Sequence, residues 1–264
     1  MFASADLTQS NEMRAAACVR LIAWNCHHGS LRARLAHLSA LSPAIVFLQE
    51  FRPARTPAPM TPFATQRVNA RKGVALGSLD PSHSVVKLRP RAGRGRGVVG
   101  AKVTGPASFI ALGIWSQGPR YVDDVLQTVD AYRSILRAGP AVVMGDLNSG
   151  TSLARKRRTN NGHSRIVDAL ADLGLVSAYH AFHRVQHGHE SHPTYRHLWK
   201  ASNLWHIDFC FVPFSWVANL IRVDVLDGKE WTARSDHLPL VVDLRFADTI
   251  YSAKHAGWER AGSA

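Results

Sequence analysis

The stretch VRLIAWNCHHGSLRARLAHLSALSPAIVFLQE, residues 19–50, decides the expected fold class. Residues 19–24 form a short, mostly apolar run, which is typical of a buried strand. Leucines then recur at helical spacing across residues 31–41, and Ser42-Pro43 ends that helix. The apolar run 44–48 predicts a second strand. A strand, a helix and a strand in this order indicate an α/β protein.

The rest of the chain continues this mixed pattern. The sequence predicts strands at 73–79, 97–103, 108–114, 141–144, 207–212, 221–226 and 238–244, and helices at 121–136 and 166–175. Expected loops are the proline-rich residues 52–62, the Arg/Gly-rich residues 87–96, and the basic residues 149–163; residues 180–200 are rich in histidine. No repeat or linker divides the chain. We therefore expect a loose leader over 1–18, one domain over 19–247 and a tail over 248–264.

The charge balance narrows the possible partners. Lys and Arg number 32 against 19 Asp and Glu, which gives a formal net charge of +13. Such an excess favours nucleic acid, an anionic membrane or phosphorylated small molecules as partners. The sequence contains no run of about 18 apolar residues, so no membrane-spanning helix is expected. The absence of a signal-peptide pattern and the wide spacing of Cys18, Cys26 and Cys210 predict a reducing, cytoplasmic location.

Polar residues with metal-binding or acid–base chemistry fall at the ends of the expected strands. They are Asn25, Glu50, Asp146, Asn148, Asp208, Asp236 and His237. Taken singly, an Asp after a strand is more often a turn or cap residue. A rigid sheet fixes side chains at strand ends while loops admit a ligand, so the joint pattern predicts a functional site.

Electrostatics decides what such a site must contain. Carboxylates within about 4–6 Å of one another resist joint ionisation, and a divalent cation removes that conflict. All-oxygen ligands suit Mg²⁺ or Mn²⁺ rather than zinc. Mg²⁺ usually keeps several waters and takes phosphate oxygens from its substrate, which is the setting for phosphoryl hydrolysis.

Five short segments carry a family resemblance. They are Trp24-Asn25, Leu48-Gln49-Glu50, Gly145-Asp146-Leu147-Asn148, His206-Ile207-Asp208-Phe209 and Ser235-Asp236-His237. With them the chain resembles the endonuclease/exonuclease/phosphatase superfamily, the group that includes deoxyribonuclease I and the abasic-site nucleases. The resemblance implies an α/β four-layer sandwich, in which two mixed β-sheets pack face to face and helices flank them.

The resemblance also implies where a metal ion binds. Glu50 would be the principal ligand, with Asn25 and Asp236 beside it. Tyr195, in Pro193-Thr194-Tyr195, resembles a residue that lines the site before the strand of Asp208. The implied cofactor is Mg²⁺ or Mn²⁺.

The remaining matched residues would carry the chemistry. His237 would act on the scissile phosphate as a general acid or base, or as a charged stabiliser. Asp208 would orient His237 and fix its tautomer. Asp146 would activate or position the attacking water. Asn148 would hydrogen-bond a phosphate oxygen or help to place the metal.

Two positions depart from the family pattern. Many members carry a second His, or a Tyr, where this chain has Trp115. An indole only donates one hydrogen bond, so Trp115 would either stack on a base or sugar or pack internally. His27 stands where some abasic-site members have an Asp, and it would contact phosphate when protonated.

Two basic loops favour a nucleic acid as the substrate. One loop contains Arg94 and Arg96 and the other contains Arg157. Either loop alone is slightly more typical of a solvated, disordered segment, whereas two such loops on a chain of this charge favour tracking of a phosphate backbone. The sequence therefore predicts a nuclease that cleaves DNA or RNA without strong sequence preference. One alternative is a phosphatase or phosphodiesterase acting on a small phosphorylated molecule or a lipid headgroup. Another is a catalytically inactive nucleic-acid-binding module.

Overall fold

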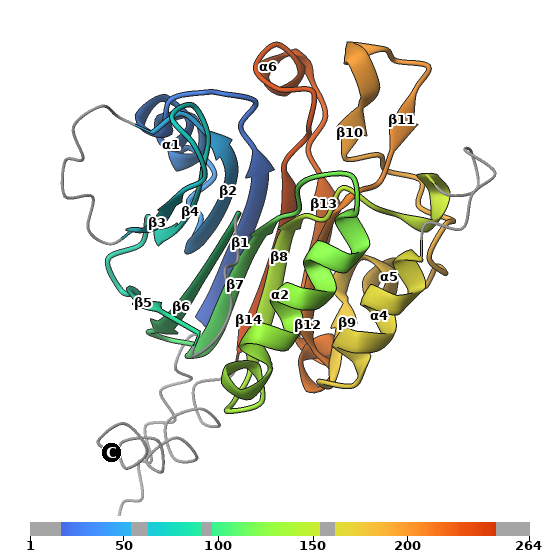
Figure 1. Cartoon of the computed structure of the whole chain (residues 1–264). Helices are drawn as coiled ribbons and strands as arrows, with labels where there is room; N and C mark the ends of the chain where they lie inside the picture. The colour runs from blue at the N-terminus through green and yellow to red at the C-terminus, as the bar shows by residue number, and fades with distance from the viewer. Residues whose placement is uncertain (1–16, 54–62, 91–96, 154–161, 247–264) are drawn as a thin grey trace, which may run out of the picture.

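A computed structural model of the chain describes residues 17–53, 63–90, 97–153 and 162–246. Its strands form two six-stranded sheets (Figure 1). The first sheet runs, in spatial order, β13 (Leu220–Val225), β14 (Leu240–Phe246), β1 (Ala17–Asn25), β2 (Ile45–Phe51), β4 (Gly73–Ser78) and β3 (Phe63–Arg67). The second runs β5 (Ser84–Leu88), β6 (Val98–Thr104), β7 (Phe109–Trp115), β8 (Ala141–Asp146), β12 (Asp208–Pro213) and β9 (Leu175–Ser177).

Both sheets are mixed, and both place one parallel pair at their centre. In the first sheet β1 and β2 are parallel, and in the second β7 and β8 are parallel. The other named pairs in the two sheets are antiparallel. The ends of β1 and β8 carry Asn25 and Asp146, so the central strands deliver two of the expected site residues.

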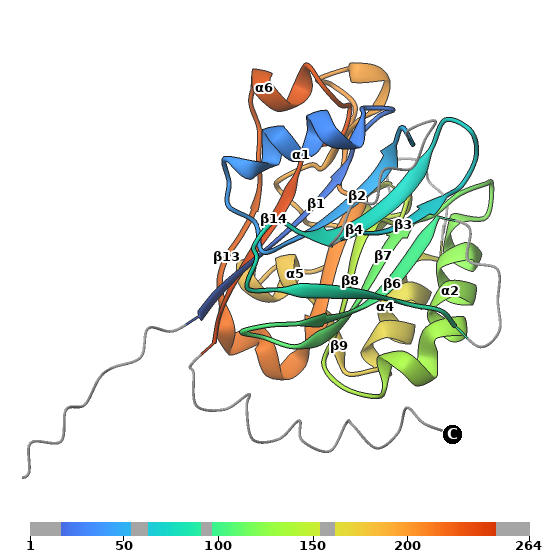
Figure 2. The same cartoon turned by 90° about the vertical axis from the view of Figure 1, so that its left-hand side faces the viewer.

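The sheets pack face to face, with helices outside (Figures 1 and 2). Buried side chains from both sheets form one core between them, including Phe47, Leu76, Val142 and Met144. Helix α1 (Leu31–Ser39) covers the outer face of the first sheet (Figure 2). Helices α2 (Tyr121–Leu136) and α4 (His163–Ala171) cover the outer face of the second through a separate apolar cluster. These four layers confirm the expected sandwich.

A short hairpin and a short helix stand at the end of the sheets where the site residues lie (Figure 1). The hairpin of β10 (Tyr195–Arg196) and β11 (Leu204–Trp205), with the 3₁₀ turn His197–Trp199 between them, lies above the sheets beside α6 (Lys229–Thr232) (Figure 1). Helix α5 (Ala178–His183) contacts β12 and β13, and a 3₁₀ helix spans Phe214–Asn219. No helix in the described ranges is long and apolar enough to cross a membrane.

Several local expectations need correction. The short strands β3 and β5 were not predicted, and β5 includes Lys87 and Leu88 from the expected Arg/Gly-rich loop. Both strands lie at sheet edges with mixed exposure, so they lack a clear apolar run. The expected helix 166–175 begins earlier and ends at Ala171, because Gly174 adopts a left-handed φ of 74° before β9. The first strand begins at Ala17, inside the expected leader.

Candidate active site

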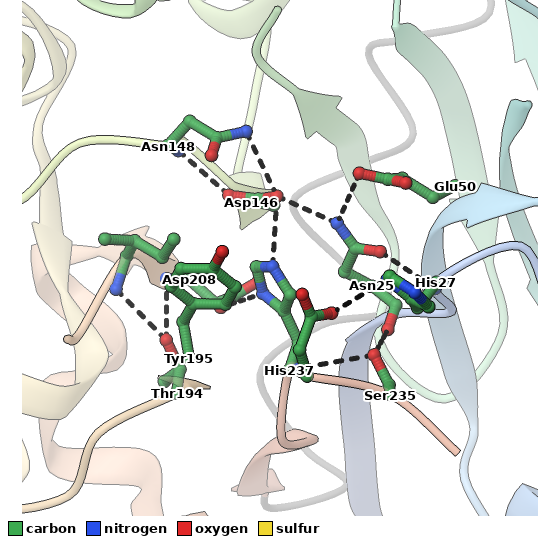
Figure 3. Close-up of polar contacts among 12 residues, drawn as sticks. Asn25, His27, Glu50, Asp146, Asn148, Thr194, Tyr195, Asp208, Ser235 and His237 are labelled. Carbon is green, nitrogen blue, oxygen red and sulfur yellow. Dashed lines mark hydrogen bonds and ion pairs between the residues drawn. The ribbon is translucent and has the colours of Figure 1, made fainter. Parts of the chain in front are cut away.

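Asn25 joins the two sheets at the centre of the site (Figure 3). Its Nδ2 donates to Oδ2 of Asp146 at 2.9 Å and to Oε1 of Glu50 at 3.2 Å. Its Oδ1 accepts a hydrogen bond from the backbone amide of His27. Asn25 and Glu50 belong to the first sheet and Asp146 to the second, so this amide fixes side chains of both sheets in one place.

Glu50 reaches the site because the backbone of β2 is irregular there. The pairing of β2 with β4 shifts register between Leu48 and Phe51, and Glu50 has a left-handed φ of 53°. A bulge of this kind redirects a side chain and often lies beside a functional site. The Oε2 atom of Glu50 accepts a hydrogen bond from the ammonium group of Lys72. The carboxylate is thereby aimed away from the core and neutralised by a cation.

Asp146 ends β8 after a glycine that no other residue can replace without strain. Gly145 has φ of 142°, and a Cβ atom there would lie 2.1 Å from the carbonyl oxygen of Ile114. Asp146 is fully buried, and its Oδ1 accepts from the backbone amide of Asn148. The Asn148 side chain donates to Oδ2 of Asp146 at 3.2 Å and to the carbonyl oxygen of Ser116 at 3.0 Å.

His237 and Asp208 form a buried imidazole–carboxylate pair. Nδ1 of His237 lies 2.9 Å from Oδ2 of Asp208, which fixes a proton on Nδ1 and points Nε2 toward Asp146. That Nε2 atom lies 3.8 Å from Oδ2 of Asp146. The hydroxyl of Thr194 accepts hydrogen bonds from the amides of Ile207 and Asp208, both at 3.0 Å, and so holds the start of β12 (Figure 3).

The protonation of this pair follows from its surroundings. Burial raises the pKa of Asp146 to about 7, and the nearby Asp208 carboxylate adds to the increase while His237 opposes it. Burial works against a charge on His237, but the carboxylates of Asp208, Asp146 and Asp236 raise its pKa to about 10. We conclude that His237 is a cation at neutral pH and that Asp146 titrates within the physiological range.

Asp236 and His27 lie on the more accessible side. Nδ1 of His27 is 3.0 Å from Oδ1 of Asp236, and the side chains are 40% and 14% exposed. The hydroxyl of Ser235 donates to the carbonyl oxygen of Asn25 at 2.7 Å and accepts from the amide of His237 at 3.1 Å. The 235–237 segment is thereby attached directly to the end of β1.

The structure brings most of the expected residues together. We call the group Asn25, Glu50, Asp146, Asp208 and His237 the catalytic cluster, after the role that we propose for it below. Asn148, Asp236 and His27 adjoin it through the contacts given above, and the ring of Tyr195 lies 4.5 Å from that of His237. Burial raises the pKa of Tyr195 to about 12, so its hydroxyl stays protonated. Arg94, Arg96 and Arg157 lie outside the described residues.

Trp115 is packed at the base of the site rather than displayed at its surface. It ends β7 opposite Asp146 and is 6% exposed. The ammonium group of Lys72 lies 5.0 Å from the centre of its ring. Internal packing and a cation–π contact therefore account for this tryptophan. An exposed aromatic beside the site is Trp199, which is 46% exposed and has its ring 5.3 Å from that of His27.

Sequence reasoning missed Lys72, Trp199 and the structural role of Thr194. Lys72 precedes an expected strand and belongs to no motif, so nothing local marks it as the partner of Glu50. Trp199 lies in a hairpin of two-residue strands, which are too short to show periodicity. Thr194 stands inside the quoted Pro193-Thr194-Tyr195 segment, which was the available signal.

Comparison with known proteins agrees with this geometry. Residues 22–237 match the family model described as the Endonuclease/Exonuclease/phosphatase family. The chain belongs to this family. No curated protein sequence matches it closely.

Solved structures with the same fold include three nucleases. A 3′-5′ exonuclease from Neisseria meningitidis superposes with a TM-score of 0.64 at 19% identity, covering 86% of this chain and 99% of that one. The endonuclease domain of TRAS1, a telomere-specific non-LTR retrotransposon, gives 0.65 at 15% identity, with 88% and 100% coverage. An AP endonuclease from Archaeoglobus fulgidus gives 0.64 at 17% identity, with 85% and 98% coverage. At these identities the likeness establishes the shared fold.

The donor groups of this family member fit a hard divalent cation. The acidic groups offer carboxylate oxygens, and the buried Oδ1 of Asp208 has no hydrogen-bond partner among the described residues. Asp146, Asp208 and His237 place ligand atoms within 4.8 Å of one another. Because the raised pKa of His237 keeps its imidazole protonated, that imidazole is unsuited to metal ligation. Glu50 and Asp236, 15% and 14% exposed, are the accessible carboxylates.

Proposed function

We propose that the protein is a divalent-metal-dependent phosphodiester hydrolase, and that it cleaves DNA or RNA without strong sequence preference. The observation that carries the proposal is the single hydrogen-bonded group in which Asn25 bridges Glu50 and Asp146 while His237, paired with Asp208, faces Asp146. Membership of a family of phosphoester hydrolases and the nuclease structures with the same fold support it.

Glu50, Asn25 and Asp236 are the residues that would hold Mg²⁺ or Mn²⁺. A bound ion of this kind supplies Lewis-acid stabilisation of the charge that develops on the phosphate. Lys72 donates a hydrogen bond to the Glu50 carboxylate, and Nδ1 of His27 lies 3.0 Å from Oδ1 of Asp236. Both carboxylates are partly exposed, so a cation from solvent can reach them.

His237 and Asp146 divide the proton chemistry. Between pH 7 and 10 His237 is protonated, so its Nε2–H is suited to donate to a non-bridging phosphate oxygen as a charged stabiliser. Asp146, ionised above about pH 7, is suited to accept a proton from the attacking water. Asn148 positions Asp146 through two hydrogen bonds. The raised pKa of His237 thus favours the stabiliser role over that of general base.

Charge and one exposed aromatic favour nucleic acid as the substrate. The net charge of +13 attracts polyanions. Trp199 offers a partly exposed ring directly beside His27, where an unpaired base could stack, and base–aromatic stacking tolerates any sequence. The buried Trp115 is not positioned for that role.

The test is an activity panel on the purified full chain with Mg²⁺ or Mn²⁺, covering duplex DNA, single-stranded DNA, RNA, abasic DNA and inositol phosphates. We expect cleavage of at least one nucleic acid and its abolition by excess EDTA. Activity that survives EDTA would remove the metal mechanism. Turnover of inositol phosphates alone would move the substrate to small phosphoesters, and nucleic-acid binding without any turnover would indicate an inactive module.

Salt dependence separates a polyanionic from a small substrate. We expect log affinity for duplex DNA to fall by about 0.9 per neutralised phosphate for each tenfold rise in salt. The measurement is a binding titration at several salt concentrations with the Glu50→Gln variant, which should bind DNA without cutting it. A flat salt profile would contradict the nucleic-acid assignment.

A further inference from the structure

A second group of ionisable side chains adjoins the loop that leads to Thr194 and Tyr195. It comprises His163, His180, His187, Glu190 and His206, which we call the histidine cluster. The four imidazoles surround the ring of Phe209, at 4.8 to 6.2 Å between ring centres. None of these histidines belongs to the catalytic cluster described above.

Three members of the histidine cluster present ligand atoms to one point. His180, His187 and Glu190 each place one such atom within 4.8 Å of the others. Nε2 of His180 lies 3.0 Å from Oε1 of Glu190. Two donors on one tetrahedral zinc ion, at bond lengths of about 2.0–2.2 Å, are separated by roughly 3.3–3.5 Å. The separation of His180 and Glu190 is therefore close to that of two ligands on a shared ion, and the other two pairs lie within the 4.8 Å bound.

The cluster leaves buried polar atoms without a protein partner. Oε2 of Glu190, Nδ1 of His187 and Nε2 of His206 have no hydrogen bond among the described residues. The Glu190 side chain is 1% exposed and His206 is 2% exposed. An unsatisfied buried polar atom costs about 1–3 kcal/mol, so three of them in one cluster indicate a missing ligand.

The second nitrogens of two imidazoles are already fixed in the way that metal-ligating histidines require. Nδ1 of His206 lies 2.8 Å from the carbonyl oxygen of His192, and Nδ1 of His180 lies 2.7 Å from the hydroxyl of Ser177. Such contacts set the tautomer and turn Nε2 toward the ion. Burial lowers the pKa of His187 to about 3 and lowers that of His206, so both rings are neutral and keep a free lone pair.

We propose that His180, His187 and Glu190 bind a structural zinc ion, and that the nearby His206, whose Nε2 atom lies outside this group of three, moves to supply the fourth donor. Imidazole-rich donors with one carboxylate suit zinc, whereas Mg²⁺ prefers oxygen ligands. The burial of His180 and His206 is typical of a closed, structural site. The ion would attach the loop before Thr194 to the start of β12, and so stabilise the segment that holds Asp208.

The experiment measures zinc in the full chain, purified without a histidine tag and kept in excess Mg²⁺. We expect about one zinc per chain in the wild type, in Glu50→Gln and in His189→Ala, an exposed histidine of the same loop. Zinc should fall to near zero in His187→Ala and in Glu190→Gln. Zinc retained by both of these variants, or a wild type that binds none on titration, would overturn the proposal.

Cobalt substitution covers the case in which a variant fails to fold. Co²⁺ added to chelated wild-type protein should give the intense visible absorption of a four-coordinate ion, and Zn²⁺ should displace it. The same spectrum in Glu50→Gln would separate this site from the catalytic cluster. Zinc should also raise the midpoint of thermal unfolding of the wild type; a wild type with no cobalt spectrum and no shift would disprove the site.

Discussion

The catalytic cluster and the histidine cluster both adjoin the start of β12, and each contains a buried imidazole about 3 Å from a carboxylate: 2.9 Å for His237 and Asp208, 3.0 Å for His180 and Glu190. The protonation of the two clusters differs because their ratios of carboxylates to imidazoles differ. In the first, several carboxylates surround one imidazole, and the pKa of His237 rises to about 10. In the second, four imidazoles share one carboxylate, and burial lowers the pKa of His187 to about 3.

This difference decides what each cluster can do. An excess of carboxylates keeps a proton on the imidazole and calls for an added hard cation, which suits phosphate chemistry. An excess of imidazoles leaves neutral nitrogen lone pairs, which suit a borderline metal such as zinc. Burial acts to raise the pKa of Glu190, but hydrogen bonds from His180 and the Gly188 amide outweigh it and lower this pKa to about 2, so the carboxylate is ionised at neutral pH. Distance alone would not have separated the two clusters.

The largest expected effect is the loss of turnover in His237→Ala. Removing a positioned proton-bearing group typically costs about 10²–10⁴-fold in rate, and we expect kcat/KM to fall within that range. The zinc content should stay unchanged, and His189→Ala should keep wild-type rates. Equal losses of turnover and of zinc would mean that the two clusters are one cooperative unit.

A second, smaller effect concerns the pH dependence of the rate. In the wild type we expect a bell-shaped profile that rises as Asp146 ionises near pH 7 and falls as His237 deprotonates near pH 10. Asp208→Asn retains a hydrogen-bond acceptor but removes the charge that raises the pKa of His237. The alkaline limb should therefore move toward lower pH.

The raised pKa of His237 also makes the stability of the fold depend on pH. His237 has a pKa above its ordinary value of about 6.5, so its contribution is complete below that pH and is lost as pH rises through about 10. The free energy of unfolding, measured by denaturant titration, should fall over this window in the wild type and less in Asp208→Asn. An unchanged alkaline limb of the pH–rate profile in Asp208→Asn would contradict the role proposed for Asp208.

Sequence alone predicts the catalytic cluster better than the histidine cluster, for a physical reason. Asn25, Glu50 and Asp146 each terminate a long buried apolar run, so local pattern marks both the strand and its end. Members of the histidine cluster come from α4, α5, a loop and the approach to β12, and no metal-binding spacing connects them. Only tertiary packing around Phe209 brings them together.

The backbone geometry at Glu50 likewise could not be predicted from the local sequence pattern. The bulge that turns Glu50 toward Asn25 depends on how β2 pairs with β4, and the cation facing Glu50 comes from Lys72 before that partner strand. Strand pairing is set by contacts distant in sequence, so the residue types of residues 45–51 do not reveal it. The family resemblance supplied the role expected of Glu50, whereas the structure supplied its geometry.

Lys72 gives the smallest and most discriminating test of the contrast between the clusters. Its ammonium group neutralises Glu50 and would compete with a divalent ion for the same carboxylate. Lys72→Gln should therefore lower the free energy of unfolding without Mg²⁺, by about 0.5–1 kcal/mol for a partly exposed pair. Tighter ion binding in the variant should make the Mg²⁺-induced rise in the unfolding midpoint larger than in the wild type.

Arg67→Gln is a matched control, because it removes a positive charge from the neighbouring strand β3 rather than from the partner of Glu50. If Lys72→Gln and Arg67→Gln respond equally to Mg²⁺, Lys72 does not act at the carboxylates that we propose as metal ligands. If Lys72→Gln instead changes the rise in the unfolding midpoint caused by Zn²⁺, then Zn²⁺ binds at the catalytic cluster. In that case the proportion of carboxylate to imidazole does not set the metal preference of the two clusters. We expect only the rise in the unfolding midpoint caused by Mg²⁺ to grow, because Lys72 contacts Glu50 of the catalytic cluster.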